Sequence, residues 1–375
     1  MKKVEDHPIP VNQPLLDGNE RAYLNECIDS GWISSEGPFV ERFENAFARA
    51  IDRRECISVS NGTDALELAV RAVGIGPGDE VILPSFTIIS CVSAVIQAGA
   101  VPVLVDSEPV SWNMDVTQIA DKITPRTKAI MVVHIYGLPV DMDAVLALCE
   151  KYGLILIEDS AESIGLDYKG KPCGSFGDIS TFSFYANKHV TTGEGGMVGV
   201  NDPELANRCR YLRNLGFKNP RFIHDELAWN MRMTNIQAAV GLAQTERLSH
   251  FIELKKKMGL RYHRLLESLP GAALAPLQMS YADNVFWVYG MVLDDDVPFD
   301  AKETMRQLAE RKIGSRPFFW PMHEQPVLKK MGLFEGERYP VSERIARRGF
   351  YVPSGLSLSN DEIDRVAKAL FEVLS

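Results

Sequence analysis

The chain has 375 residues, of which 46% are hydrophobic, so it can bury one large core and a second, smaller one. A formal net charge of −10 at pH 7 disfavours a nucleic-acid or anionic-membrane partner, because both bind to a broad basic surface. We expect a cytoplasmic protein with free thiols and no metal site, because the sequence has no signal-peptide core, no run approaching ~18 apolar residues and no Cys-x-x-Cys pair among its six cysteines.

The N-terminal residues 1–19 contain several prolines and asparagines, and we expect them to form an arm that lies against the rest of the protein. A helix is predicted at about 19–29, and it ends at Gly31, which can adopt the left-handed cap conformation. The loop at 32–38 follows and carries Trp32. Trp32 is a candidate for a lid or an interface contact near a substrate, and simple packing of the loop is the alternative.

The first candidate binding site is a turn between a strand at 56–59 and a helix that begins near Gly62. Small polar residues end the strand, and Gly62 and Thr63 open the helix. The first N–H groups of a helix have no partner within it, so a helix start can bind a phosphate. Turns of this kind are common, and this one alone is weak evidence.

Apolar strands then alternate with helices. This pattern predicts a mostly parallel sheet covered on both faces, in which ligands bind at the carboxyl ends of the strands. The predicted strands lie at 81–83, 101–106, 128–134 and 154–157, and the predicted helices at 88–98 and 141–152. Asp159 follows the last of these strands, where a buried carboxylate is costly unless it faces a positive charge. A protonated pyridine nitrogen would supply that charge, and a carboxylate that caps a helix is the alternative.

Lys188 lies in a polar connection between an apolar strand at 179–185 and a second strand at 195–200. Confining a lysine there is unfavourable unless its amine is bonded or loses part of its charge. A Schiff base with an aldehyde does both, and pyridoxal phosphate is the usual aldehyde. A surface lysine on a hairpin is the common alternative. Together, however, Thr63, Asp159 and Lys188 would serve the phosphate, the ring nitrogen and the aldehyde of this cofactor.

The remaining sequence predicts a second domain. A helix at 205–215 and another that opens near Trp229 complete a large α/β domain at 20–248. From there to the C-terminus strands and helices alternate too little for a parallel sheet, so 249–375 is predicted to form a small α+β domain. Its predicted elements are an amphipathic run to about 269 that bridges the domains, a strand at 285–293, and helices at 301–311 and 361–374.

Three motifs give the chain a resemblance to a known family. They are Ser60-Asn61-Gly62-Thr63, Ile157-Glu158-Asp159-Ser160-Ala161-Glu162, and Asn187-Lys188 with Thr191-Thr192-Gly193-Glu194-Gly195-Gly196. With them the whole chain resembles the DegT/DnrJ/EryC1/StrS sugar aminotransferases, a branch of the fold type I enzymes that use pyridoxal phosphate. The resemblance implies a transaminase with that fold and that cofactor.

The resemblance also implies roles for single residues. Lys188 would form the Schiff base and act as the catalytic base, and Asp159 would face the pyridine nitrogen. The remaining cofactor contacts would be Gly62, Thr63 and Ser183 at the phosphate and Glu162 near the ring hydroxyl. Relatives carry an aromatic residue that stacks on the ring at the position of Ile88, so Ile88 and the nearby Phe86 are both candidates for that contact.

The resemblance further implies an obligate homodimer with shared sites. Family members place the asparagine equivalent to Asn230 on the cofactor phosphate of the neighbouring subunit. The segment at 229–235 is therefore expected to complete the site of the other copy.

As amino acceptor the resemblance implies a nucleotide-linked keto-sugar. The segments at 191–196 and 233–237 are more similar to the branch that aminates C4 than to the C3 branch, and Glu162 stands where many relatives have glutamine. From these two resemblances we expect GDP-4-keto-6-deoxymannose as acceptor and glutamate as donor. The diphosphate needs positive groups on this acidic chain, and Arg316 and Arg232 are the candidates, with surface ion pairs as the alternative. His323 lies in a segment that resembles the substrate-facing loop, although a structural histidine is the default. The alternative functions are a dTDP- or UDP-linked acceptor and a non-catalytic regulator that binds pyridoxal phosphate.

Overall fold

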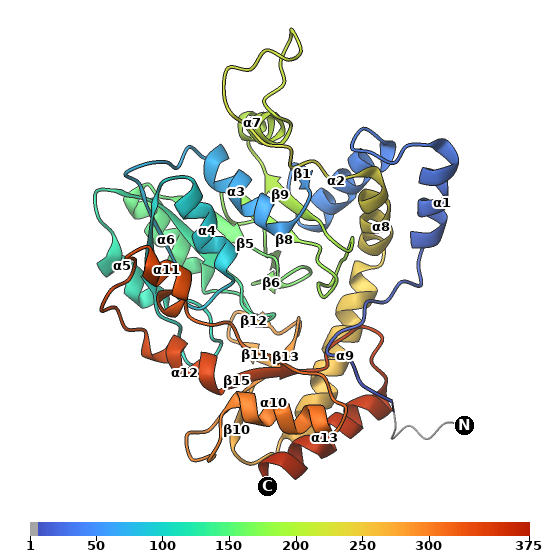
Figure 1. Cartoon of the computed structure of the whole chain (residues 1–375), viewed down its shortest axis with the longest axis vertical. Helices are drawn as coiled ribbons and strands as arrows, with labels where there is room; N and C mark the ends of the chain where they lie inside the picture. The colour runs from blue at the N-terminus through green and yellow to red at the C-terminus, as the bar shows by residue number, and fades with distance from the viewer. Residues whose placement is uncertain (1–6) are drawn as a thin grey trace.

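A seven-stranded sheet forms the centre of the computed structural model, which describes residues 7–375 (Figure 1). Its strand order is β1-β9-β8-β5-β4-β2-β3, and every neighbouring pair is parallel except the two pairs that involve β9. The prediction of a mostly parallel sheet is therefore confirmed. The strands are β1 (Glu55–Val59), β2 (Glu80–Pro84), β3 (Val101–Val105), β4 (Thr127–Val133), β5 (Ile155–Asp159), β8 (Ile179–Ser183) and β9 (Gly196–Val200).

Helices cover both faces of this sheet, because alternate residues of its strands enter cores on opposite sides. In β4, Met131 and Val133 join one core with α3, α4 and α7, while Ile130 and Val132 join another core with α6. A third core, under α2 and α8, covers β8 and β9. The helices of this part are α1 (Glu20–Ser30), α2 (Pro38–Ala50), α3 (Gly62–Ala72), α4 (Ile89–Gln97), η1 (Val116–Gln118), α5 (Ile119–Lys122), α6 (Met142–Tyr152), α7 (Pro203–Arg213) and α8 (Asn235–Thr245).

The C-terminal part is built on a four-stranded antiparallel sheet with its own core. Its order is β10 (Ala272–Leu274), β13 (Tyr289–Leu293), β15 (Gly349–Val352) and β14 (Arg316–Pro317). The long helix α9 (Leu248–Leu266) connects the two parts (Figure 1). The other elements are α10 (Ala301–Glu310), η2 (Met322–Glu324), α11 (Pro326–Lys330), α12 (Pro340–Arg348), α13 (Asn360–Leu374) and the short pairs β6 (Asp167–Tyr168) with β7 (Lys171–Pro172) and β11 (Gln278–Met279) with β12 (Ala282–Asp283).

Two predicted boundaries are wrong, and local hydrogen bonds explain both. The helix expected from Trp229 begins only at Asn235, because Thr234 caps it in a capping box and the preceding residues pair with neighbouring segments as extended chain. The strand expected at 285–293 begins at Tyr289, because the side chain of Asn284 accepts the Phe286 N–H at 2.6 Å and holds a turn.

The N-terminal arm is described from residue 7 onward, and residues 1–6 of the predicted arm lie outside the described residues. Ile9 pairs with Ile313 of the C-terminal part. Asn12 donates a hydrogen bond to the carbonyl of Ala186 at 3.0 Å, two residues before Lys188. Among residues 7–375 the six cysteines are free and buried, and no helix is long and apolar enough to span a membrane.

Candidate active site

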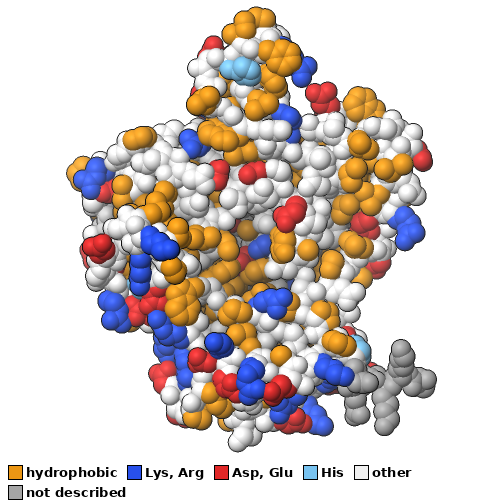
Figure 2. All heavy atoms as spheres, viewed as in Figure 1, with side chains coloured by type: hydrophobic (Ala, Val, Ile, Leu, Met, Phe, Trp, Pro, Cys, Tyr) orange, Lys and Arg blue, Asp and Glu red, His pale blue; other side chains and the backbone are white. Residues whose placement is uncertain are grey.

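A cavity of about 670 Å³ lies where the carboxyl ends of β5 and β8 meet the C-terminal part. The surface is hollowed between the two parts of the molecule (Figure 2). Gly62, Thr63, Ile88, Asp159, Glu162, Ser183 and Lys188 line this cavity. Seven of the residues predicted from sequence thus come together, although they are spread over more than a hundred positions.

The turn at the start of α3 forms one end of the cavity. Asn61 caps the helix by accepting the Asp64 N–H at 2.9 Å, and the hydroxyls of Thr63 and Ser90 are hydrogen-bonded at 2.9 Å. A Cβ at Gly62 would lie 2.8 Å from the Cβ of Ser183, closer than real side chains approach. Glycine therefore lets the helix start lie against Ser183. The hydroxyls of Thr63 and Ser183, together with the first N–H groups of the helix, can hold a phosphate.

Asp159 lies at the carboxyl end of β5, buried to 2% exposure. One of its oxygens accepts the Ala161 N–H at 3.0 Å and the other accepts the Cys91 thiol at 3.3 Å. Burial raises the pKa of this carboxyl. The alternative of a helix cap is not supported, because the residues that follow form turns and no helix. No ion pair of Asp159 occurs among residues 7–375, so this buried acid suits a cationic ligand atom.

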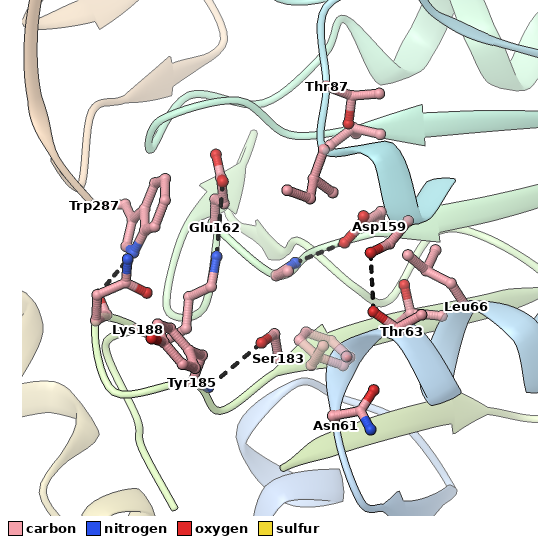
Figure 3. Close-up of a pocket in the computed structure, with 18 of the residues that line it drawn as sticks. Asn61, Thr63, Leu66, Thr87, Asp159, Glu162, Ser183, Tyr185, Lys188 and Trp287 are labelled. Carbon is pink, nitrogen blue, oxygen red and sulfur yellow. Dashed lines mark hydrogen bonds and ion pairs between the residues drawn. The ribbon is translucent and has the colours of Figure 1, made fainter. Parts of the chain in front are cut away.

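Lys188 sits in the connection between β8 and β9, with its amine 3.6 Å from an oxygen of Glu162 (Figure 3). Burial lowers the pKa of the amine, and Glu162 and Asp159 partly offset this effect. Burial raises the pKa of Glu162 to about 7, although Lys188 opposes the shift. The other oxygen of Glu162 accepts the Tyr136 N–H at 3.0 Å, which fixes the carboxyl. Burial thus disfavours the charged form of both groups, and the opposite charge of each partner opposes that effect.

These groups fit pyridoxal phosphate. The cavity offers a phosphate cradle at one end, a buried acid for the ring nitrogen and an amine within the same wall. In addition, the hydroxyl of Thr181 and the amide oxygen of Asn187 are buried without a hydrogen-bond partner in the described chain, and both residues line the cavity. Unpartnered polar atoms are costly, so a polar ligand is expected beside them.

Several lining residues were missed by sequence reasoning. They are the aromatic side chains of Tyr185, Trp287, Phe319 and Tyr351. The last three come from the C-terminal part, and the sequence shows them only as members of apolar runs. No spacing marked these last three residues as neighbours of Lys188.

Two predicted contacts need correction. Phe86 is fully buried, packs edge-on against Tyr136 and does not line the cavity, whereas Ile88, the other candidate for the ring contact, is 43% exposed and does line it. His323 is also buried away from the cavity, where its Nε2 is paired with Glu343 at 3.1 Å. The default of a structural histidine therefore describes His323 better than a substrate contact.

The four other predicted residues lie outside the cavity wall of this chain. Trp32 and Asn230 are exposed, and Arg232 is bonded to Asn214 at 2.6 Å and to Ser35 at 3.2 Å. Arg316 is exposed and pairs across β14 and β15 with Tyr351, which does line the cavity. Arg316 is thus at the rim of the cavity.

Two buried or half-buried clusters have the composition of metal sites. In the first, Glu158 accepts the N–H groups of Phe176 and Gly177 at 2.9 Å each and is paired with His134 at 3.0 Å. These bonds satisfy the carboxylate without an ion. In the second, Glu343 is held by Arg338 and His323. Both clusters therefore read as structural networks.

The sheet, the covering helices and this cavity define a fold type I aminotransferase that depends on pyridoxal phosphate. The DegT/DnrJ/EryC1/StrS aminotransferase family matches residues 14–371, and the chain belongs to that family. The GDP-perosamine synthase of Escherichia coli O157:H7 is 43% identical over 98% of this chain and 99% of its own. The GDP-perosamine synthase of Vibrio cholerae is 41% identical over 96% and 98%.

A comparison with solved structures supports the same fold and class of enzyme. The PMP form of the putative sugar aminotransferase Spr1654 from Streptococcus pneumoniae matches with a TM-score of 0.90 at 25% identity, covering 98% of each chain. The expected fold class, cofactor and enzyme class are confirmed.

Proposed function

We propose that this protein transfers an amino group from glutamate to C4 of GDP-4-keto-6-deoxymannose and so forms GDP-perosamine. The observation that carries the proposal is the similarity to two proteins named GDP-perosamine synthase, which extends over nearly the whole of each chain. The cavity with Lys188 and Asp159 is compatible with this chemistry.

When bound, pyridoxal phosphate would supply the electron sink for the transfer. Thr63, Ser183 and the N–H groups at the start of α3 would hold its phosphate, and Asp159 would keep its ring nitrogen protonated. Lys188 would bind the aldehyde and, once free, would move a proton between carbon atoms as a base. Its lowered pKa favours a neutral amine for that task, and Glu162 at 3.6 Å can take up the proton.

The nucleotide sugar would enter from the rim formed by the C-terminal part. Arg316 lies there beside Tyr351, and its exposed guanidinium can reach a diphosphate, since among residues 7–375 its side chain bonds only to the carbonyl of its chain neighbour Ser315. Arg232 is a weaker candidate, because its guanidinium already bonds to Asn214 and Ser35.

A panel of acceptors tests this substrate assignment. Purified protein with glutamate should aminate GDP-4-keto-6-deoxymannose with a kcat/KM at least about tenfold above that for dTDP- and UDP-linked 4-keto-6-deoxy sugars, which corresponds to roughly 1.4 kcal/mol of transition-state discrimination. Product mass measures the transfer. Preference for a dTDP- or UDP-linked sugar would overturn the acceptor and leave the transaminase, and no transfer to any sugar would favour the regulator.

We also propose a homodimer in which each copy completes the site of the other. After α7 the chain projects beyond the rest of the molecule (Figure 1), and apolar side chains gather on this projection (Figure 2). Phe222 is 72% exposed and Leu227 is 90% exposed. Exposed apolar groups of this kind favour burial against another surface. Asn230, which the family resemblance assigns to the partner's cofactor phosphate, lies at the end of the same projection and is exposed.

Mixing two inactive variants tests this sharing. Lys188→Ala removes the amine of one site, and Asn230→Asp places a negative charge where the partner's phosphate is expected. A mixed dimer would keep one intact site, so an equal mixture should recover about a quarter of the wild-type activity after random exchange of subunits. The absence of recovery, with subunit exchange shown by mass, would contradict a shared site.

The cytoplasmic location expected from the reduced cysteines remains part of this proposal.

A further inference from the structure

The indole ring of Trp287 lies directly against the amine of Lys188. The amine is 3.9 Å from the centre of the ring, and both side chains border the same cavity (Figure 3). Trp287 belongs to the C-terminal part and is only 4% exposed. A cation over the face of an aromatic ring is attracted by the ring quadrupole, most strongly for tryptophan and more so when water is excluded.

Three contacts fix the position of this ring. The indole N–H donates to the carbonyl of Asn187 at 2.9 Å, so the ring is bonded to the residue next to Lys188. The carbonyl of Trp287 accepts a hydrogen bond from the amine of Lys255 at 2.8 Å. Tyr136 stacks on the ring at 5.8 Å between centroids, with an angle of 25°. The ring is therefore held against the amine and does not merely fill space beside it.

Lys255 holds the backbone at Trp287 in place. It is a fully buried lysine of α9 whose amine donates to the carbonyls of both Trp287 and Ser354, the latter at 2.5 Å. Burying an amine is costly, and the hydrogen bonds to these two carbonyls offset that cost. Burial lowers its pKa to about 7.

We propose that Trp287 is a positioning residue that stabilises the charged form of the Lys188 amine and fixes the loop that carries it. The attraction exists only while the amine is charged, because a neutral amine has no cation for the ring to attract. Trp287 would thus oppose burial and set the fraction of Lys188 that is neutral at a given pH. For catalysis the inference rests on the proposed role of Lys188, but the contact itself does not.

The other groups that act on this amine are few. Glu162 lies 3.6 Å away and Asp159 acts at longer range, both favouring the charged amine, whereas burial raises the pKa of the nearby Cys91 thiol and keeps it neutral. His189 follows in the chain, but burial lowers its pKa to about 3, so it is neutral at ordinary pH. Trp287 differs from these groups because it contacts the amine but does not ionise, so replacing it changes no charge.

The test measures the charge of Lys188 directly. Full-length protein freed of cofactor is labelled with a trace of acetic anhydride over a range of pH, and the Lys188 peptide is quantified by mass spectrometry. Trp287→Leu keeps an apolar group beside the amine and removes the ring. We expect it to raise the neutral fraction about three- to tenfold at a given pH, which moves the labelling midpoint to lower pH. Trp287→Phe keeps a weaker ring face, and its midpoint should lie between the two.

Two comparisons keep the outcome decisive. The labelling rate at high pH reports access to the amine, whereas the midpoint reports its charge, and the exposed Lys257 in the same digest should be unchanged in all proteins. If Trp287→Leu does not fold, Trp287→Phe must still lie below the wild type. Equal midpoints in all folded proteins would overturn the proposal, and so would a midpoint for Trp287→Phe as low as that for Trp287→Leu, since the loss would then come from the N–H bond to Asn187. Failure of Lys188 to carry the cofactor would change none of these midpoints.

Discussion

Replacing Lys188 by alanine should reduce amine transfer by about ten-thousand-fold or more, because one side chain is assigned both the covalent link and the proton transfer. Its amine is buried beside Glu162 in the wall of the cavity, so no water-exposed lysine can replace it there. The measurement is single-turnover transfer from glutamate, followed by product mass.

One further variant separates the amine from its charge, and a second serves as a control. Lys188→Arg keeps a positive charge next to Glu162 but has no primary amine, so it should be as inactive as Lys188→Ala. Lys257→Ala removes an exposed lysine of α9 and should retain wild-type activity. Substantial turnover by Lys188→Arg would show that only the charge matters and would remove the covalent role.

Asp159→Asn should lower turnover by roughly a hundred- to ten-thousand-fold, equivalent to about 3–5 kcal/mol, the cost of leaving a buried charge without its partner. The reason is that an amide cannot hold a proton on the ring nitrogen. The amide oxygen can still accept the Ala161 N–H, so the local turn should persist.

The stability of the cofactor-free protein should respond in the opposite direction. Burial raises the pKa of Asp159 above its unfolded value, so its charged form destabilises the fold at pH values above that pKa, and the penalty disappears as pH falls. Asp159→Asn removes this penalty, and its melting temperature at pH 7 should equal or exceed that of the wild type. Asp143→Asn, at an exposed site, is the matched control. Near-normal turnover in Asp159→Asn would contradict the assignment.

Much of the fold could be predicted because the buried strands are recognisable in the sequence as short, nearly continuous apolar runs. The run at 128–134 is apolar on both faces, and the structure indeed sends Met131 to one core and Val132 to the other. Such a strand needs helices on both sides, which fixes a mostly parallel sheet and, with it, the edge where ligands bind. Gly62, Asp159 and Lys188 could be found because each residue type is costly or unusual at its position without a ligand.

The sequence could not predict contacts that depend on how the two parts meet. Trp287 donates a hydrogen bond to Asn187, 100 positions earlier in the chain, and no local sequence pattern predicts such a contact. Phe86 and Ile88 differ by two positions, yet one faces the core and the other the cavity, and this choice depends on where α4 begins. For His323 the deciding fact is a partner, Glu343, on α12.

Reduction of the purified full-length protein with borohydride, followed by peptide mapping, tests the assignment of Lys188 most directly. We predict a yellow protein that bleaches on reduction and carries the mass of the reduced cofactor on the peptide that contains Lys188. Lys255 provides an internal comparison, because it is a fully buried lysine whose amine bonds to the carbonyl of Trp287 beside this loop, and its peptide should be unmodified. Reduced cofactor on Lys255 or another lysine, or none on the Lys188 peptide after bleaching, would contradict the assignment.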